Sequence, residues 1–86
     1  MIVKWAGEAW ADYRRWHDEN RQVHKRINRL VEAIEADPFR GIGKPEALRH
    51  SLAGCWSRRI TVEHRIVYKV TGQTVHILSC RYHYRK

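Results

Sequence analysis

The chain has 86 residues, of which 17 are lysine or arginine and 9 are aspartate or glutamate, giving a formal net charge of +8. This length fits a single domain, residues 1–86, and excludes two. A cationic excess of this size favours a polyanionic partner, which can be a nucleic acid, a membrane surface or an acidic protein.

The N-terminal residues and the cysteines indicate the cellular compartment. The opening MIVKWAGEAW has no apolar run long enough for a signal peptide or a membrane span. Cys55 and Cys80 are far apart and form no C-x-x-C pair. We therefore expect reduced thiols rather than a disulfide framework, and a cytoplasmic protein.

The N-terminal half predicts one strand followed by two helices. Residues 2–5 are an apolar run typical of a first strand, and Ala9, Tyr13 and Trp16 then fall on one helical face. From Asn20 onwards a second segment with a basic outer face has apolar residues at helical spacing, namely Val23, Ile27, Leu30, Val31 and Ile34. This helix should end by residue 37, because a proline follows there. We expect the two helices to form an antiparallel pair.

The C-terminal half predicts a loop and then strands. Residues 39–45 (FRGIGKP) are loop-like by their glycine and proline content, and Glu46 lies in the same loop as it leads to the sheet. After Gly54 the pattern alternates. One parity is apolar: Trp56, Ile60, Ile66, Tyr68, Val70, Leu78, Cys80 and Tyr82. The other is polar: Ser57, Arg59, Thr61, Arg65, Lys69, Ser79, Arg81 and His83.

This alternation predicts three antiparallel strands, with turns near residues 62–63 and at residues 72–73. The apolar face should pack on the helices, and the opposite face should be cationic. The predicted fold class is α+β, with two N-terminal helices packed on a mostly antiparallel, twisted β-sheet.

Metal and nucleotide motifs are not evident in the sequence. The six histidines include no H-x-x-x-H pair on the predicted helices, and neither cysteine has a ligand at zinc-finger spacing. GIGKPE superficially resembles a phosphate loop, but Pro45 stands where serine or threonine is required. We expect neither a metal nor a cofactor.

The predicted cationic face suggests a possible chemistry. Arg59, Arg65 and Arg81 should project together from three neighbouring strands, with His83 near the end of the last. On composition alone, a solvated face that binds polyanions passively is the simpler interpretation. Metal-free RNA cleavage requires a base for the ribose 2′-OH, fixed cations for the phosphorane and an acid for the leaving oxygen. Glutamate, arginine and histidine are a sufficient set, although a lone loop carboxylate such as Glu46 is usually just solvated.

Four motifs resemble those of the YoeB-type toxins of the RelE superfamily, which belong to bacterial toxin–antitoxin systems. They are GKPEAL (43–48), LAGCWSRRI (52–60), EHRIVY (63–68) and CRYHY (80–84), in family order and at family-like spacing. The resemblance runs from Trp5 to Tyr84. It implies a RelE-like microbial ribonuclease fold and a ribosome-dependent endoribonuclease, an mRNA interferase. Such a toxin cuts messenger RNA in the ribosomal A site without metal and inhibits translation.

The resemblance also implies roles for particular residues. The general base falls on Glu46 within GKPE, and the transition-state arginine falls on Arg65 within EHRIVY. The general acid falls on His83 and a supporting tyrosine on Tyr84, both within CRYHY. The expected RNA-holding residues are Lys44, Arg49, His50 and Arg59, with Arg81 added from the predicted cationic face.

The implied partners are messenger RNA, the ribosome with the 16S rRNA of its small subunit, and a cognate YefM-like acidic antitoxin. Homodimers are common among such toxins. Operator DNA should be contacted through the antitoxin complex, since the chain shows no helix-turn-helix pattern. Two departures from the family are Arg85 and Lys86 beyond the last tyrosine, and Cys55 where a bulkier residue is often found.

Two alternatives remain open from the residues alone. The first is a non-enzymatic RNA- or ribosome-binding module that uses only its basic face. The second is a DNA-binding regulator acting within a toxin–antitoxin complex.

Overall fold

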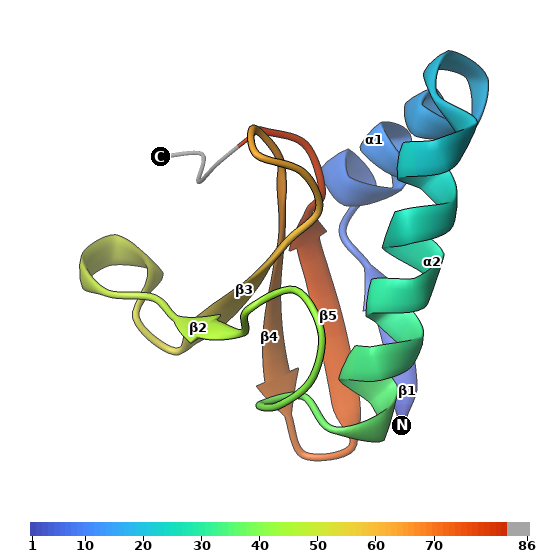
Figure 1. Cartoon of the computed structure of the whole chain (residues 1–86). Coiled ribbons are helices and arrows are strands. Elements are labelled where there is room, and N and C mark those ends of the chain that lie inside the picture. Colours follow the sequence, from blue (N-terminus) through green and yellow to red (C-terminus); the bar gives the residue numbers. More distant parts are fainter. Residues whose placement is uncertain (83–86) are drawn as a thin grey trace.

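The computed structural model describes residues 1–82, so the expectations for His83, Tyr84, Arg85 and Lys86 lie outside the described residues. The chain runs through β1 (Ile2–Trp5), α1 (Gly7–Glu19), α2 (Arg21–Ala36), β2 (Glu46–Ala47), the 3₁₀ helix η1 (His50–Leu52), β3 (Cys55–Arg59), β4 (Arg65–Thr71) and β5 (Thr74–Ser79) (Figure 1). The predicted first strand and both predicted helices are confirmed.

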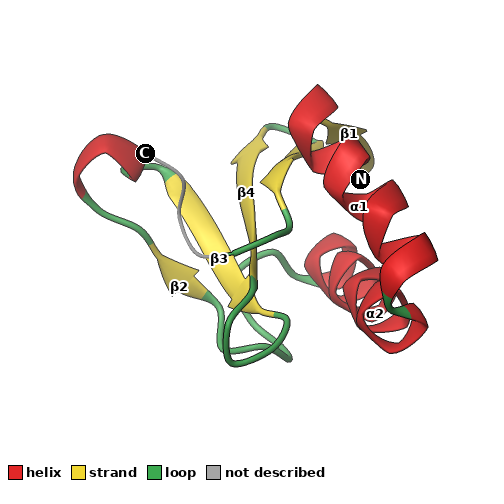
Figure 2. Ribbon diagram, turned by 90° about the horizontal axis from the view of Figure 1, so that it is seen from above, coloured by secondary structure: helices red, strands yellow, loops and turns green. Residues whose placement is uncertain are grey.

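The five strands form one sheet in the order β1-β5-β4-β3-β2. β1 pairs with β5 in parallel, and every other pair is antiparallel. Both long helices lie on one side of the sheet (Figure 2). β2, followed by η1, forms the edge of the sheet opposite β1. This arrangement confirms the predicted α+β class. Neither α1 nor α2 is long and apolar enough to cross a membrane.

Local sequence signals set the ends of α2. The Asn20 side chain accepts hydrogen bonds from the backbone N–H groups of Gln22 and Val23, both at 3.2 Å, so it caps the helix as asparagine commonly does. At the other end Asp37 is extended, as expected before Pro38. The apolar face of the helix is buried through Val23, Ile27, Leu30 and Ile34. Each of these side chains contributes about 1.5–3 kcal/mol by leaving water.

Strand register confirms which residues of β3 and β4 share a face, but burial does not alternate there, because Ser57 and Val67 on the face away from the helices are also buried. In β5 the predicted phase itself is wrong. Val75 and Ile77 are fully buried there, whereas Leu78 is only half-buried and does not belong to the core. The cause is an irregularity in the β4–β5 register, where Val67 pairs with Ser79 and Tyr68 with Ile77. Because Leu78 is an extra residue, the strand changes phase at this point. Tyr82, predicted inside, is 49% exposed beyond the end of β5.

Candidate active site

Strand register brings three of the predicted site residues to the face of the sheet opposite the helices. Glu46 pairs with Ser57, and Arg59 pairs with Arg65 across the β3–β4 hairpin. Residues directly opposite in antiparallel strands share a face, and alternate residues of one strand do too. Glu46, Arg59 and Arg65 therefore project on the same side. β2 and β4 lie two strand spacings apart, about 10 Å, which is within combined reach of these long side chains.

The prediction that Glu46 lies in a loop is wrong, because it begins the short edge strand β2. Pairing with β3 holds this strand, and the Leu48 N–H donates to the Cys55 carbonyl at 2.9 Å just beyond it. The Glu46 side chain remains exposed. The sheet thus sets the direction of the Glu46 Cα–Cβ bond, and the side chain is open to a ligand.

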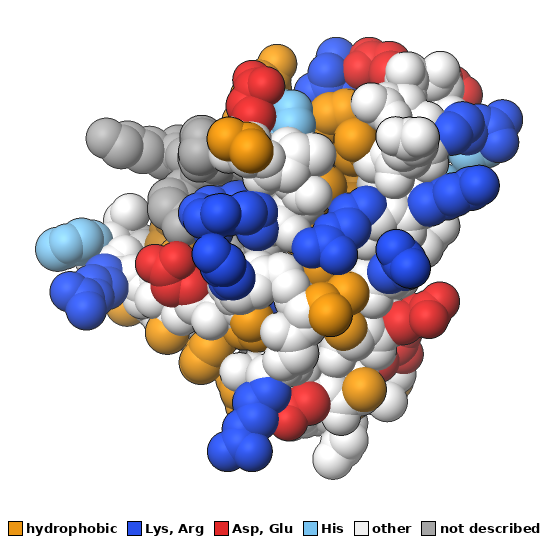
Figure 3. All heavy atoms as spheres, in the orientation of Figure 1, with side chains coloured by type: hydrophobic (Ala, Val, Ile, Leu, Met, Phe, Trp, Pro, Cys, Tyr) orange, Lys and Arg blue, Asp and Glu red, His pale blue; other side chains and the backbone are white. Residues whose placement is uncertain are grey.

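A pocket of about 370 Å³ opens beside β2 and η1. Its lining joins Glu46 to two of the predicted RNA-holding residues, Arg49 and His50, together with Ala47, Leu48 and Leu52. Lys44, also predicted to hold RNA, is exposed two residues before Glu46. Lysine and arginine side chains form a band across the face of the molecule seen in Figure 3.

A buried arginine that the sequence analysis did not single out holds the loop before β2. Arg58 is fully buried and donates to the carbonyls of Asp37 (2.6 Å), Arg40 (2.9 Å) and Ile42 (3.2 Å). Its Nε also donates to the Tyr68 hydroxyl at 3.1 Å. The alternation could have identified this arginine as inward-facing, since residue 58 shares the parity of Trp56 and Ile60, which were predicted on the apolar face.

Gly43 allows this loop to lie directly against β3. Its φ is +85°, and a Cβ at this position would meet Leu30 Cδ2 at 2.7 Å and the Arg58 Cβ at 3.1 Å. Its carbonyl accepts from the Arg59 backbone N–H at 2.6 Å. Glycine is therefore required both by the backbone conformation and by the close approach. The loop is fixed immediately before Lys44 and Glu46.

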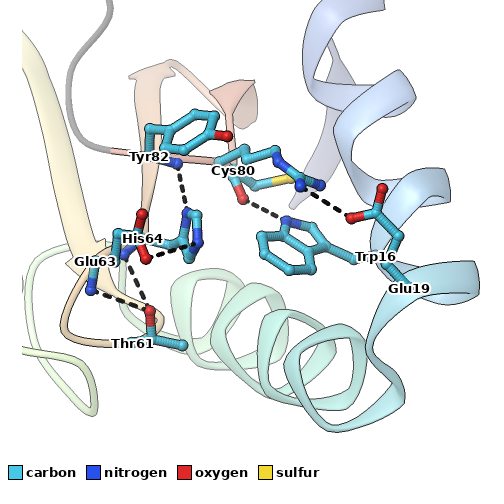
Figure 4. Close-up of polar contacts among 8 residues, drawn as sticks. Trp16, Glu19, Thr61, Glu63, His64, Cys80 and Tyr82 are labelled. Carbon is cyan, nitrogen blue, oxygen red and sulfur yellow. Dashed lines mark hydrogen bonds and ion pairs between the residues drawn. The ribbon is translucent and has the colours of Figure 1, made fainter.

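The chain after β5 is fastened at several points (Figure 4). The Trp16 indole donates to the Cys80 carbonyl at 2.9 Å, and Arg81 pairs with Glu19 at 2.9 Å. The guanidinium of Arg81 also lies 4.4 Å from the Trp16 ring centroid. The expectation that Arg81 joins Arg59 and Arg65 on the open face is therefore wrong. Arg81 is 9% exposed, because the chain leaves β5 at Ser79 and residue 81 turns toward α1.

Ionisable groups at this attachment are perturbed in different directions. The hydrogen bond from Arg81 lowers the pKa of Glu19. Burial raises the pKa of Asp12, although a hydrogen bond with the Cys80 backbone opposes that shift. Burial also raises the pKa of the Cys80 thiol to about 12. These groups support the structure of the segment rather than offering reactive side chains.

The arrangement can perform acid–base chemistry on a polyanion. One open face presents a carboxylate and two guanidinium groups, which can accept a proton and stabilise negative charge. Among residues 1–82, no group of three histidine, cysteine, aspartate or glutamate side chains lies close enough to hold a metal ion.

Comparisons of the sequence with known proteins agree on one family. Residues 5–84 match the model for the YoeB-like toxin of bacterial type II toxin–antitoxin systems. The chain is 50% identical to toxin YoeB of Escherichia coli K12 over 84 residues, covering 98% of this chain and 100% of that protein.

Solved structures agree with this match. A YoeB/ParE toxin from Agrobacterium tumefaciens superposes with a TM-score of 0.95 at 43% identity, covering 98% of this chain and 100% of that one. A chain in a YoeB–YefM complex from Staphylococcus aureus superposes with a TM-score of 0.89 at 40% identity, covering 98% of each chain.

Proposed function

Because the chain belongs to the YoeB-like toxins of bacterial type II toxin–antitoxin systems, we propose that it is a ribosome-dependent endoribonuclease. In this proposal the toxin cleaves messenger RNA in the ribosomal A site by metal-independent acid–base catalysis, and so inhibits translation.

The proposed reaction is an internal transfer at phosphorus. Glu46 removes the proton of the ribose 2′-OH, and the 2′-oxygen attacks the adjacent phosphate. Arg65 stabilises the negative charge of the phosphorane. The P–O5′ bond then breaks as His83 gives its proton to the leaving 5′-oxygen, with Tyr84 supporting the site. The products carry a 2′,3′-cyclic phosphate, which can open to a 3′-phosphate, and a 5′-hydroxyl.

One observation carries this assignment. Glu46, Arg59 and Arg65 share the open face of the sheet through strand register, and the Arg65 backbone N–H donates to the Tyr82 carbonyl at 2.8 Å. Tyr82, which precedes the proposed acid in the sequence, is therefore tied to the proposed transition-state arginine. The proposed base and the proposed transition-state arginine share one face, and we infer that His83 supplies the acid there.

The surrounding cations are proposed to hold the RNA and the 16S rRNA. Lys44, Arg49, His50 and Arg59 are exposed around Glu46 and its pocket. Phosphate contacts by such side chains position a nucleic acid without reading its sequence. The net charge of +8 also favours fast, salt-dependent encounter with the ribosome.

Antitoxin binding is proposed from the same charge and from the relatives. The Staphylococcus aureus relative is described in complex with YefM. We infer a YefM-like acidic antitoxin for this toxin, because an acidic segment that folds on binding would neutralise the open basic face. We also infer a cytoplasmic location, a homodimer as an accessible state, and operator DNA contact through the antitoxin complex.

The decisive experiment separates cleavage from binding. Single-turnover cleavage of A-site messenger is measured on saturated ribosomes, and ribosome affinity is measured independently. His83→Gln should bind with nearly wild-type affinity and cleave about 10²–10⁴-fold more slowly, since a positioned acid or base contributes that factor. Glu46→Gln should behave in the same way. His17→Gln is the matched control, because His17 is exposed on α1.

The product ends test the nucleophile. Messenger with a 2′-O-methyl group at the cut position should resist cleavage, and a 3′-hydroxyl product would refute attack by the 2′-oxygen. If His83→Gln cuts at an undiminished rate, His83 is not the acid. If the wild-type protein binds ribosomes and cuts nothing, the non-enzymatic ribosome-binding module is the correct function.

A further inference from the structure

The backbone of Tyr82 is held on both sides by two consecutive residues. Its N–H donates to His64 Nδ1 at 2.7 Å, and its carbonyl accepts from the Arg65 N–H at 2.8 Å. Tyr82 has a φ of +60°, a conformation that non-glycine residues rarely adopt. Such a conformation persists only where surrounding contacts fix it. Here the hydrogen bond that Tyr82 donates to His64 and the one that it accepts from Arg65 supply that constraint.

The hydrogen bond to Tyr82 dictates the protonation of His64. A ring nitrogen that accepts from an amide carries no proton, so the tautomer that fits this hydrogen bond has its proton on Nε2. Nε2 lies 3.8 Å from the Glu63 carboxylate, and the side chain is 12% exposed. Figure 4 shows the ring between Tyr82 and the turn that carries Thr61 and Glu63.

The ring is fixed in orientation by its neighbours. Trp16 of α1 meets it edge-on, with ring centroids 4.7 Å apart. The His64 backbone N–H donates to Thr61 Oγ1 at 3.0 Å, which anchors the residue at its other end. Because Trp16 also donates to the Cys80 carbonyl, one indole orders both the imidazole and the chain that it holds. His64 is therefore a rigid acceptor rather than a mobile surface histidine.

We propose that His64 is a positioning residue, whose neutral imidazole accepts the Tyr82 N–H and sets where the chain after Tyr82 begins beside Arg65. The inference rests on the proposed function, in which the next residues, His83 and Tyr84, act on RNA. His64 itself touches no substrate. Its contribution is the placement of the acid, and a misplacement of about 1 Å can reduce a rate about 10²-fold.

The first test reads the hydrogen bond directly and requires no cleavage. Nitrogen-15 correlation spectra of the imidazoles at neutral pH, with His64→Asn used for assignment, should show His64 as the tautomer protonated on Nε2. The Tyr82 amide should exchange with solvent more slowly than in His64→Gln. An Nδ1-protonated tautomer, or equal exchange of the Tyr82 amide in both proteins, would overturn the proposal.

The second test compares two substitutions, each of which puts a polar atom where one of the two ring nitrogens lies. In His64→Asn the side-chain oxygen takes the place of Nδ1 and can still accept from Tyr82. In His64→Gln the polar end takes the place of Nε2 instead. Single-turnover cleavage on saturated ribosomes should fall about 10–100-fold for His64→Gln and no more than about 3-fold for His64→Asn. Ribosome affinity should be unchanged in both, as in the His17→Gln control.

Failure of the positioning role and failure of the proposed function give different results. Equal rates in the Asn and Gln variants, whether both normal or both reduced, would overturn the positioning role. A general loss of stability would lower the melting temperatures of both variants together, so these temperatures identify it. If the wild-type protein cleaves no RNA, the proposed function fails, while the tautomer and the Tyr82 amide still decide whether His64 holds the chain.

Discussion

Replacing Arg58 by methionine should destabilise the fold far more than the same change at Arg59. Arg58 is fully buried and donates to three loop carbonyls and to the Tyr68 hydroxyl. The Tyr68 hydroxyl in turn donates to the Pro38 carbonyl at 2.6 Å. Methionine fills a similar volume but supplies no donor. The carbonyls of the loop at residues 37–42 would then lose the group that gathers them.

The expected loss can be estimated from these contacts. A hydrogen bond to a charged group contributes about 1.5–3 kcal/mol, and such values are not additive within one network. Removing one side of a buried charged network costs about 3–5 kcal/mol. A domain of this size is stable by about 4–13 kcal/mol. Arg58→Met should therefore reduce the free energy of unfolding by about 3–5 kcal/mol, a large part of the total.

Urea denaturation measures this difference, and each variant is made in a Glu46→Gln background, which by the proposed function should lack toxicity. Arg59→Met is the matched control. Since Arg59 is exposed, its replacement should change stability by less than about 0.5 kcal/mol. Tyr68→Phe should cost an intermediate amount, about 1–2 kcal/mol. If Arg58→Met and Arg59→Met differ by less than about 1 kcal/mol, Arg58 does not hold the loop in the way that its contacts indicate.

Two further predictions concern the segment after β5. The pKa of Glu19 is lowered from its ordinary 4.5 by Arg81, so its stabilisation is present above pH 4.5 and disappears as the pH falls through the folded-state pKa. Glu19→Gln should thus melt below the wild type at pH 7 and together with it in strong acid, and a gap that persists in acid would refute the ion pair. The Cys80 thiol, with a pKa of about 12, should react with a thiol reagent only after unfolding, whereas rapid labelling of the native protein would show that this thiol is accessible.

Patterns carried by neighbouring residues predicted the helices and the first strand. The asparagine at position 20 and the proline at position 38 mark the ends of α2, because capping and the restriction before proline act within a few residues. The turn at Gly72 joins β4 and β5 as expected, and its φ is +59°. Alternation put Arg59, Arg65 and His83 on the polar face, whereas the catalytic roles of the site residues came from the resemblance.

Expectations failed where tertiary structure overrides alternation. A single extra residue at Leu78 inverts the phase of β5, and alternation cannot anticipate it. Arg81 has the parity of an outward strand residue, but the strand has ended and Glu19 and Trp16 draw the guanidinium inward. Glu46 was expected in a loop because two residues are too few to produce a visible period of two.

The β3–β4 hairpin connects the two halves of the proposed site through neighbouring residues that face opposite ways. Arg58 points inward and gathers the loop before Glu46, while the Arg59 backbone N–H holds Gly43 and its side chain remains exposed on the other face. At the same end of the hairpin, where Arg59 pairs with Arg65, the Tyr82 backbone is hydrogen-bonded to His64 Nδ1 and to the Arg65 N–H. The loop before Glu46 and the backbone of Tyr82 are thus both held by the same two-stranded unit. A change in that hairpin should therefore alter their separation, even where the changed residue touches neither of them.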